Sequence, residues 1–468
     1  MADVVSRLAE FAVQPRANFP QAMEQASIAG LLDTLAVTIA GSADADFRLL
    51  AQSIDVSPVS CRSALYSGPD TALLLGFASH VLDYDDVSML CVCHPSAPII
   101  SALLAFCTSA LATQPITGTS FLNAYCVGTE VMVRTGQALG FRHYQLGFHP
   151  TSTLGALGAA AAVCAALALS PRQCAAALGI AASMSGGLKK NFGSPVKPLH
   201  VGLAAASGLR AAQMALAGLG ASPGPFEEGG FIHAFSGGTT DRWPEQLALG
   251  KPFAIMEPGF EAKRYPCCYL LHKTIEAVLE IQSDAGLQAP TWRRAEVRLP
   301  AGSLEALIHP YPTTGLAGKF SAPYVVAAGL LDGSIGLSSF KDSAVLRSDV
   351  QDRLHDVTVL EVGTAGDAGD DIGCAPVDVE VFWPGGGSSA RRITASPGSS
   401  QDPMTRIQQR EKWIDCLRAG RPGLSRAEAD RQFGLGLGFV AMADVRPWLR
   451  ELLPVDQQQS QPQKEAFP

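Results

Sequence analysis

The strongest constraint on the fold is the series of alanine- and glycine-rich segments that fills residues 1–259. Apolar residues recur in these segments at spacings of three and four, which is the period of a helix with one buried face. Glycine or proline separates one segment from the next, as at Ala40-Gly41 and at Pro171. Because alanine and glycine are small, such helices can pack with their axes close together. This part of the chain is therefore predicted to form a compact helical bundle.

Six of its helices are expected at residues 28–39, 71–82, 98–111, 120–139, 151–169 and 170–184. The stretch from Thr151 to Ser170 carries no charge and is long enough to span a bilayer. However, it consists mainly of alanine and glycine, whose transfer into lipid releases little free energy. We interpret it as a buried helix.

After Gly259 the pattern becomes mixed. Segments in which apolar and polar residues alternate are typical of strands, and they lie at 295–299, 357–362, 377–383 and 389–394. The last two flank the turn sequence WPGGG, which favours a hairpin. Helices are expected at 322–331 and at 269–281, the latter with Lys273 and Glu276 facing outward.

Helical patterns return at 403–417 and 426–453. The predicted fold is mostly α, with a large all-helical domain and a smaller α+β lid domain inserted before the C-terminal helices. The expected boundaries are 1–260 for the first part of the helical domain, 261–398 for the lid and 399–454 for the returning helices. Residues 455–468 are rich in Gln and Pro and are expected to be disordered.

Composition excludes some partners. The chain has 468 residues, a formal net charge of -8 and only 17% charged residues. An acidic protein with scattered cations is unsuited to nucleic acid or to an anionic membrane surface. Sparse charge on so large a chain indicates that some apolar surface is covered by a partner subunit.

The compartment is predicted from the N-terminus and from cysteine use. The first twenty residues show no secretory signal, so a cytoplasmic location is expected, with a mitochondrial one left open. Four of the eleven cysteines, Cys107, Cys126, Cys164 and Cys174, lie in apolar helical segments, where a free thiol behaves as a small hydrophobe. We therefore expect the cysteines to be reduced.

One long segment lacks acidic residues altogether. Between Glu130 and Glu227 there is no Asp or Glu. The segment does contain seven cationic residues, which are Arg134, Arg142, Arg172, Lys189, Lys190, Lys197 and Arg210. This charge pattern predicts a local site for a small carboxylate or phosphate.

The first candidate site motif, at residues 80–98, contains Asp83, Asp85, Asp86 and His94. Carboxylates at the end of a helix face the negative end of its dipole, which is unfavourable unless a cation or substrate compensates. Asp83 and Asp86 are expected to share a face, with Asp85 turned elsewhere. The alternative is a solvated helix end with no further role.

Two further motifs fall in the acid-free segment. His149 in GFHPTS precedes a proline and a helix start, which places an imidazole near a natural carboxylate site. Lys197 and His200 lie in SPVKPLHVG, where an apolar environment would lower the pKa of Lys197 and suit it for proton transfer. The alternatives are a histidine with its hydrogen bonds satisfied and a lysine whose stem covers apolar surface.

The fourth motif, AKRYPCCYLLHK, places Lys263 and Arg264 at the predicted junction between the domains, where a cleft would open. It also contains ligand types for zinc. The set to consider is Cys267, Cys268 and His272, together with Cys91, Cys93 and His94. Adjacent cysteines chelate zinc poorly, so this alternative has less support than a site without metal.

Together, LDYDD…HPSAP, GFHPTS, VKPLHVG, KRYPCC…H and APYVVAAGLLDG resemble the MmgE/PrpD family, in the family's order, over roughly residues 5–450. The family includes 2-methylcitrate dehydratase, cis-aconitate decarboxylase and iminodisuccinate epimerase. The resemblance implies a helical domain with an α+β lid, usually in a homodimer. It also implies no metal and no organic cofactor.

By position in these motifs, the resemblance assigns active-site roles to Asp83, His94, His149, Lys197, Lys263 and Tyr324. His149 or Lys197 would act as the base, His94 or Tyr324 as the acid, and Asp83 would orient a histidine. Substrate binding is expected from Lys263, Arg264, Cys268 and His200. Two positions depart from the decarboxylase members: Val87 replaces a threonine and Cys268 replaces a histidine.

The expected activity is that of a lyase acting on a citrate- or aconitate-like di- or tricarboxylate after a proton is removed next to a carboxylate. The simplest version is a 2-methylcitrate-type dehydratase. The alternatives are a cis-aconitate decarboxylase, an epimerase of an iminodisuccinate-like diacid, and a protein that binds carboxylates without catalysis.

Overall fold

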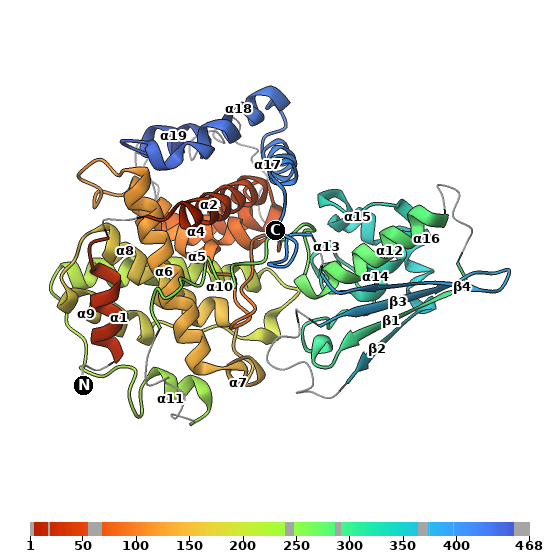
Figure 1. Ribbon diagram of the computed structural model, residues 1–468, viewed down its shortest axis with the longest axis horizontal. Coiled ribbons are helices and arrows are strands. Elements are labelled where there is room, and N and C mark those ends of the chain that lie inside the picture. The colour runs from red at the N-terminus through yellow and green to blue at the C-terminus, as the bar shows by residue number, and fades with distance from the viewer. Residues whose placement is uncertain are drawn as a thin grey trace, which may run out of the picture.

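The computed structural model describes residues 4–16, 19–54, 68–238, 248–285, 292–363, 373, 375–395 and 397–453. A helical body and a smaller α+β lid lie side by side (Figure 1). The predicted fold class, mostly α with an α+β part before the C-terminal helices, is confirmed. The tail at 455–468 lies outside the described residues.

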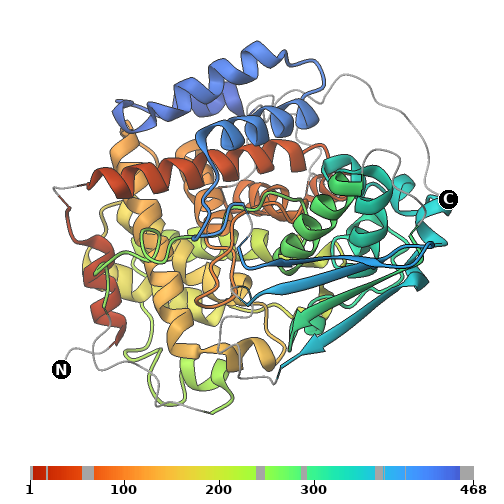
Figure 2. The same ribbon diagram turned by 45° about the vertical axis from the view of Figure 1, so that its right-hand side comes forward.

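The first part of the helical body contains α1 (Val4–Val13), α2 (Gln21–Gly41), α3 (Ala45–Ile54), α4 (Gly68–His80), α5 (Ser96–Thr108), α6 (Gly118–Leu139), α7 (Phe141–Gln145), α8 (Pro150–Ala166), α9 (Pro171–Ser183), α10 (Val196–Leu216) and α11 (Phe231–Ser236). The chain returns to it with α17 (Arg406–Gly420), α18 (Arg426–Leu437) and α19 (Arg446–Leu452). Figure 2 shows these last helices lying over α2, far from it in sequence.

Helix α8 is the predicted apolar helix, and it is a buried core element. Every residue from Pro150 to Cys164 is buried, and the helix packs between α6 and α10. No single helix among the described residues is long and apolar enough to cross a membrane. Helices α2 and α3 pass the test when they are counted as one segment, but the chain bends by 83° between them, and the test considers length and composition alone.

Small residues allow the core helices to approach closely. A side chain on Gly202 of α10 would place its Cβ 2.3 Å from the backbone oxygen of Leu73 on α4. A Cβ on Gly158 of α8 would lie 2.9 Å from the backbone oxygen of Gly128 on α6. These contacts fix the position of α10, which carries Lys197.

The lid contains α12 (His272–Ala285), β1 (Arg294–Pro300), α13 (Gly315–Gly318), α14 (Ala322–Asp332), α15 (Asp342–Val345), α16 (Ser348–Gln351), β2 (Val357–Val362), β3 (Val377–Phe382) and β4 (Ser388–Ile393). Its sheet has the order β2-β1-β3-β4, with β1 and β2 parallel and the other pairs antiparallel. Helices α12 and α14 cover one face (Figure 1). The expected hairpin is present, with Phe382 opposite Ser388.

Three local predictions were wrong. The C-terminal segment 426–453 is two helices, because α18 ends at Leu437 and α19 begins only at Arg446. Lys273 does not face outward: it is 5% exposed, and its ammonium donates to the backbone oxygens of Gly373 and Ala375, each at 2.8 Å. Glu276 is half-buried and accepts a hydrogen bond from the Tyr265 hydroxyl.

Candidate active site

The centre of the site is Asp83, in the loop between α4 and α5. Its Oδ1 accepts from Lys197 Nζ at 2.7 Å and from Lys263 Nζ at 2.8 Å. Lys197 lies in the first turn of α10 and Lys263 in the segment that leads into the lid. All three side chains are buried. Burial opposes ionisation of Asp83, but the two ammonium groups outweigh it and hold its pKa well below the usual range.

Asp83 also has an unusual backbone. Its φ is +51°, a left-handed conformation that costs free energy for a residue other than glycine, although Asp tolerates it better than most. Lys263 Nζ stabilises this turn by donating to the Asp83 backbone oxygen at 3.0 Å. The second carboxylate oxygen, Oδ2, is buried without a hydrogen-bond partner among the described residues.

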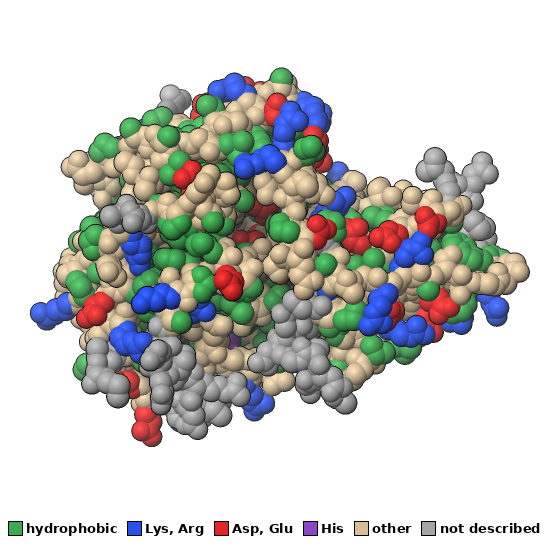
Figure 3. Space-filling view, in the orientation of Figure 1, with side chains coloured by type: hydrophobic (Ala, Val, Ile, Leu, Met, Phe, Trp, Pro, Cys, Tyr) green, Lys and Arg blue, Asp and Glu red, His purple; other side chains and the backbone are tan. Residues whose placement is uncertain are grey.

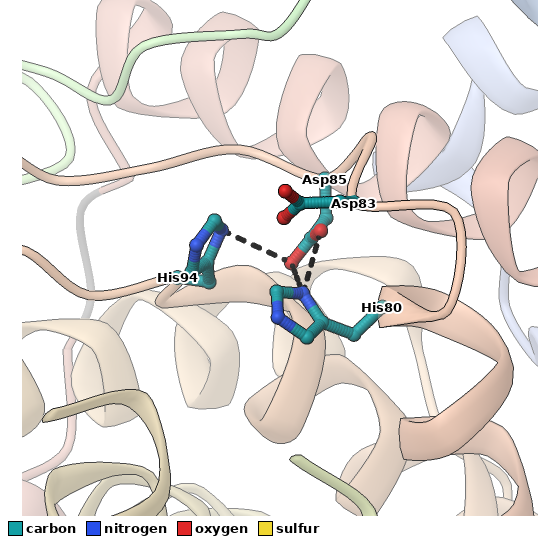
Figure 4. Close-up of side chains that lie close together, drawn as sticks. All are labelled: His80, Asp83, Asp85 and His94. Atoms are coloured by element: carbon teal, nitrogen blue, oxygen red, sulfur yellow. Dashed lines mark hydrogen bonds and ion pairs between the residues drawn. The ribbon is translucent and has the colours of Figure 1, made fainter. Parts of the chain in front are cut away.

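Asp85 binds two histidines. Its carboxylate lies 2.8 Å and 2.9 Å from His80 Nδ1 and 3.4 Å from His94 Nδ1 (Figure 4). The two imidazole rings meet edge to face with centroids 4.5 Å apart. Burial lowers the pKa of His80 to about 3 and also lowers that of His94. Both rings are therefore neutral near pH 7. The Asp85 carboxylate orients His80, whereas the nearest partner of His94 Nδ1 is the backbone oxygen of Asp86, at 2.7 Å.

Asp86 points away from these groups. It accepts hydrogen bonds from the Ser96 hydroxyl and from the Ser96 backbone N–H, and the Ser96 hydroxyl also contacts the Tyr125 hydroxyl. Burial raises the pKa of Asp86 to about 7. The prediction that Asp83 and Asp86 share a face was wrong, because the chain here is a turn rather than a helix and the two have separate partners. Orienting a histidine falls to Asp85 in this structure, not to Asp83.

A second histidine pair lies across the site. His149, at the start of α8, and His200, on α10, have their Nδ1 atoms 3.1 Å apart. Burial and then Lys197 lower the pKa of both, to about 4 for His200 and well below the usual range for His149. The His149 and His80 ring centroids are 6.0 Å apart, so the two histidine pairs are neighbours.

Aromatic rings close one side of the site. The ring of Phe192 meets that of His149 edge to face at 5.0 Å. The ammonium of Lys197 lies 5.2 Å from the Phe192 centroid and 4.9 Å from that of Phe320, which belongs to the lid. Cys268 packs against the same small apolar cluster. Body and lid thus both contribute to a dry wall beside the lysines.

The segment between Glu130 and Glu227, which has no acidic residue, contributes fewer cations to the site than its charge predicted. Of its seven cations, Lys197 joins this cluster, whereas Arg142, Arg172, Lys190 and Arg210 are exposed. Lys189 instead forms an ion pair with Glu305 of the lid at 2.7 Å. Arg134 pairs with Glu130 at 2.8 Å.

The structure places two predicted site residues outside the cluster. Tyr324 is buried in the lid core, where its hydroxyl donates to the backbone oxygen of Ser339. Arg264 is partly exposed, and its side chain lies 3.8 Å from Glu276. Among the described residues, neither side chain forms a hydrogen bond or ion pair with Asp83 or the site histidines. The other predicted residues, which are Asp83, His94, His149, Lys197, His200, Lys263 and Cys268, are gathered in one place.

Sequence reasoning missed His80 as a site residue. The signal was present, because His80 ends α4 three residues before Asp83 and five before Asp85. Its Nε2 is buried without a hydrogen-bond partner among the described residues, on the ring whose Nδ1 is held by Asp85.

One group of side chains has donor types suited to a metal ion. Among the described residues, one group of possible metal ligands lies with its ligand atoms within 4.8 Å of one another. It consists of His80, Asp83, Asp85 and His94. It contains no cysteine, so the zinc alternative built on Cys91, Cys93, Cys267 and Cys268 has no support here. Two ammonium groups already neutralise Asp83, and they would repel a cation at this place.

Sequence comparison covers both parts of the chain. Residues 6–244 match the MmgE/PrpD N-terminal domain, and residues 265–433 match the MmgE/PrpD C-terminal domain. The chain belongs to the MmgE/PrpD family. The resemblance inferred from the five motifs is thereby confirmed.

Several curated relatives carry one name. Cis-aconitate decarboxylase of Homo sapiens is 29% identical to this chain over 344 residues, which is 70% of each protein. That of Mus musculus is 27% identical over 82% of this chain and 80% of its own length. That of Aspergillus terreus is 28% identical over 85% of this chain and 84% of its own.

Proposed function

We propose that this protein is a lyase that decarboxylates a small unsaturated tricarboxylate of the cis-aconitate type. The observation that carries the proposal is the buried meeting of two ammonium groups with two imidazole pairs around Asp83 and Asp85. Relatives named cis-aconitate decarboxylase favour this reaction over the dehydratase that the motifs first suggested.

The ammonium groups suit the charge of the substrate and of its transition state. Lys197 and Lys263 share one carboxylate oxygen of Asp83, so each ammonium keeps N–H donors that a substrate carboxylate can accept, although the ionised Asp85 balances the second charge. Loss of CO₂ breaks one C–C bond and leaves its electron pair on carbon, where an adjacent carboxylate delocalises it. Fixed cations in a dry site stabilise that charge with little reorganisation.

The imidazoles suit the proton transfer that follows. Replacing CO₂ by hydrogen consumes one proton, which must reach a substrate carbon. His149 is a neutral imidazole beside Lys197, and it is better placed to exchange a proton than Lys197, whose ammonium is paired with Asp83. His94, held near Asp85, is proposed as the alternative donor of this single proton, and Tyr324 has no part in this scheme.

The same groups would also serve a dehydratase. Dehydration removes a proton next to a carboxylate, forms a C=C bond and expels hydroxide together with a proton. The same cations would stabilise the enediolate charge in dehydration. The two reactions therefore differ in whether the C–C bond to a carboxylate or the C–H bond next to it lies nearest the imidazoles. We retain 2-methylcitrate dehydration and iminodisuccinate epimerisation as comparison reactions.

The test is to incubate the purified protein separately with cis-aconitate, 2-methylcitrate and iminodisuccinate in deuterated buffer and to follow each by NMR. The expected result is loss of cis-aconitate with release of CO₂ and one solvent deuterium at carbon in the product. Water loss from 2-methylcitrate alone would replace the proposal with the dehydratase. Deuterium uptake by iminodisuccinate without loss of atoms would indicate the epimerase.

A protein that binds without catalysis would be recognised by a different pattern. It would be stabilised by tricarboxylates in a thermal unfolding assay but would convert none of the three acids. That result would overturn the proposal of an enzyme.

A further inference from the structure

Two buried lysines outside the site described above bond to the chain on either side of Asp83. Lys319 directly follows α13 of the lid, and Lys412 lies on α17 of the helical body. Their side chains come from opposite parts of the molecule. Both are buried, at 5% and 6% exposure.

Each ammonium joins the same two chain segments. Lys319 Nζ donates to the backbone oxygen of Leu82 and, at 3.0 Å, to that of Pro266. Lys412 Nζ donates at 2.8 Å to the backbone oxygens of Tyr84 and Lys263. The residues just before and just after Asp83 are therefore both fastened to the segment that carries Lys263.

The two fastenings differ in what they depend on. Lys412 is neutralised by Asp33 of α2 at 2.6 Å, and both lie on packed helices of the body. The hydrogen bonds of Lys319 go to uncharged carbonyl groups, and its ammonium also lies 5.2 Å from the Phe340 ring centroid. Burying an ammonium on neutral partners is costly, so stability alone gives no reason for a lysine there.

We propose that Lys319 is a positioning residue through which docking of the lid sets the Asp83 carboxylate against Lys197 and Lys263. Lys412 holds the residue after Asp83, which is Tyr84, and does so from the helical body rather than from the lid. The role rests on the proposed function, because positioning matters only if the Asp83 cluster is the reacting site. Asp83 needs such support, since its left-handed backbone relaxes to an ordinary conformation when its flanks are released.

The experiment compares Lys319→Met with Lys341→Met in the full chain. Methionine keeps the apolar stem of Lys319 and removes its charge. Lys341 is an exposed lysine of the same lid and serves as the matched control. Two readouts are taken: hydrogen exchange of the peptide covering residues 82–86 in the free protein, and kcat and KM for cis-aconitate.

The expected result for Lys319→Met is faster exchange at residues 82–86 and a kcat reduced about 100-fold, the loss that follows a displacement of about 1 Å. Exchange in α8 and α10 should not change, and Lys341→Met should match the wild type throughout. Unchanged local exchange or an unchanged kcat would overturn the proposal. Faster exchange throughout the molecule would also overturn it, because the role would then be structural.

A charge-preserving variant gives a second readout. Burial lowers the pKa of Lys319 to about 8. Asp83, Cys267 and Asp44 act to raise this pKa, whereas Lys263 acts to lower it further. The ammonium is thus present below pH 8 and is lost above it, so kcat should fall on the alkaline side. Lys319→Arg stays charged, and we expect it to retain activity with that fall moved to higher pH. An alkaline limb identical to that of the wild type would overturn the proposal.

The two hypotheses fail in different ways. If the wild-type protein converts none of the three acids, the proposed function fails. The positioning role can then still be tested by two measurements. These are local exchange at residues 82–86 and the affinity for tricarballylate, a tricarboxylate with no double bond. If the wild type is active and Lys319→Met behaves like Lys341→Met, the positioning role fails alone.

Discussion

Asp83 and Asp86 are three residues apart and both buried, but their pKa values are shifted in opposite directions. Two ammonium groups within 2.8 Å keep Asp83 ionised, whereas the Asp86 carboxylate accepts from the Ser96 hydroxyl and backbone N–H, and burial raises its pKa to about 7. Desolvation acts on both carboxyl groups, so the presence of a cation decides the difference. Sequence spacing alone could not reveal which of the two would meet the lysines.

The pKa of Asp86 predicts an unusual pH dependence of stability. Its folded-state pKa of about 7 lies above the ordinary value of 3.8, so the folded protein binds one more proton than the unfolded chain between these values. Stability from this group is therefore present below pH 4 and is lost as the pH rises through 7. At roughly 1.4 kcal/mol per pKa unit, the effect is at most about 4 kcal/mol.

Asp86→Asn, which cannot ionise, should remove this loss. The check is the free energy of unfolding by urea at pH 5 and pH 8, with exposed Asp352→Asn as the control. We expect the difference between the two pH values to shrink in Asp86→Asn and to stay as in the wild type in Asp352→Asn. An unchanged difference in both variants would mean that Asp86 is ionised throughout.

His149→Ala and Lys197→Ala should each abolish turnover while the fold is retained. Removal of a proton-transfer imidazole typically lowers kcat by about 10²–10⁴-fold, and removal of Lys197 leaves the substrate charge without one of its cations. Turnover of cis-aconitate and the circular dichroism spectrum are to be measured together. Exposed His355→Ala of the lid is the control. Full activity in both site variants would contradict the assigned site.

At the scale of elements, the helix that carries Lys197 was the main omission from the sequence prediction. Pro198, Gly202 and Gly208 read as helix breakers, yet α10 runs from Val196 to Leu216. Pro198 is tolerated because it lies in the first turn, where a backbone N–H has no partner within the helix. The glycines are required for contact, since a Cβ on Gly208 would lie 2.4 Å from the Cβ of Ala159.

Gly202→Ala should therefore destabilise the protein. Its new Cβ would meet the backbone of α4, which cannot move aside as a flexible side chain can. Overpacking of this kind costs about 1–3 kcal/mol. The measurement is the midpoint of urea unfolding, with Gly220→Ala as the control, because nothing lies within 4 Å of a Cβ there. Equal midpoints for the two variants would contradict the close approach of α4 and α10.

At the scale of the whole molecule, charge and apolar surface are unevenly distributed. Acidic and basic side chains are both dense over the lid on the face shown in Figure 3. On α10 of the body, by contrast, Leu203 and Leu216 are 46% and 41% exposed, and Leu219 just beyond it is 55% exposed. Large apolar side chains in contact with water favour association.

A homodimer therefore remains our prediction. Light scattering coupled to size-exclusion chromatography should give a mass of twice 49.0 kDa. The mass should persist on dilution to micromolar concentration, because burial of apolar side chains between the subunits stabilises the dimer. A mass of 49.0 kDa across that range would contradict the prediction.

The sequence by itself determined the order of the elements and most of the residues of the site. Local periodicity specifies a helix or a strand, and the turn WPGGG placed β3 and β4 opposite each other. It could not determine which carboxylate faces which cation. Lys197 and Lys263 are separated from Asp83 by more than a hundred residues. The packing of α10 against α4 brings Lys197 to Asp83, and the path of the chain into the lid brings Lys263 there. The roles of Asp85, His80 and Lys319 follow from that packing, because distance in space, not position in the chain, sets the electrostatic interaction.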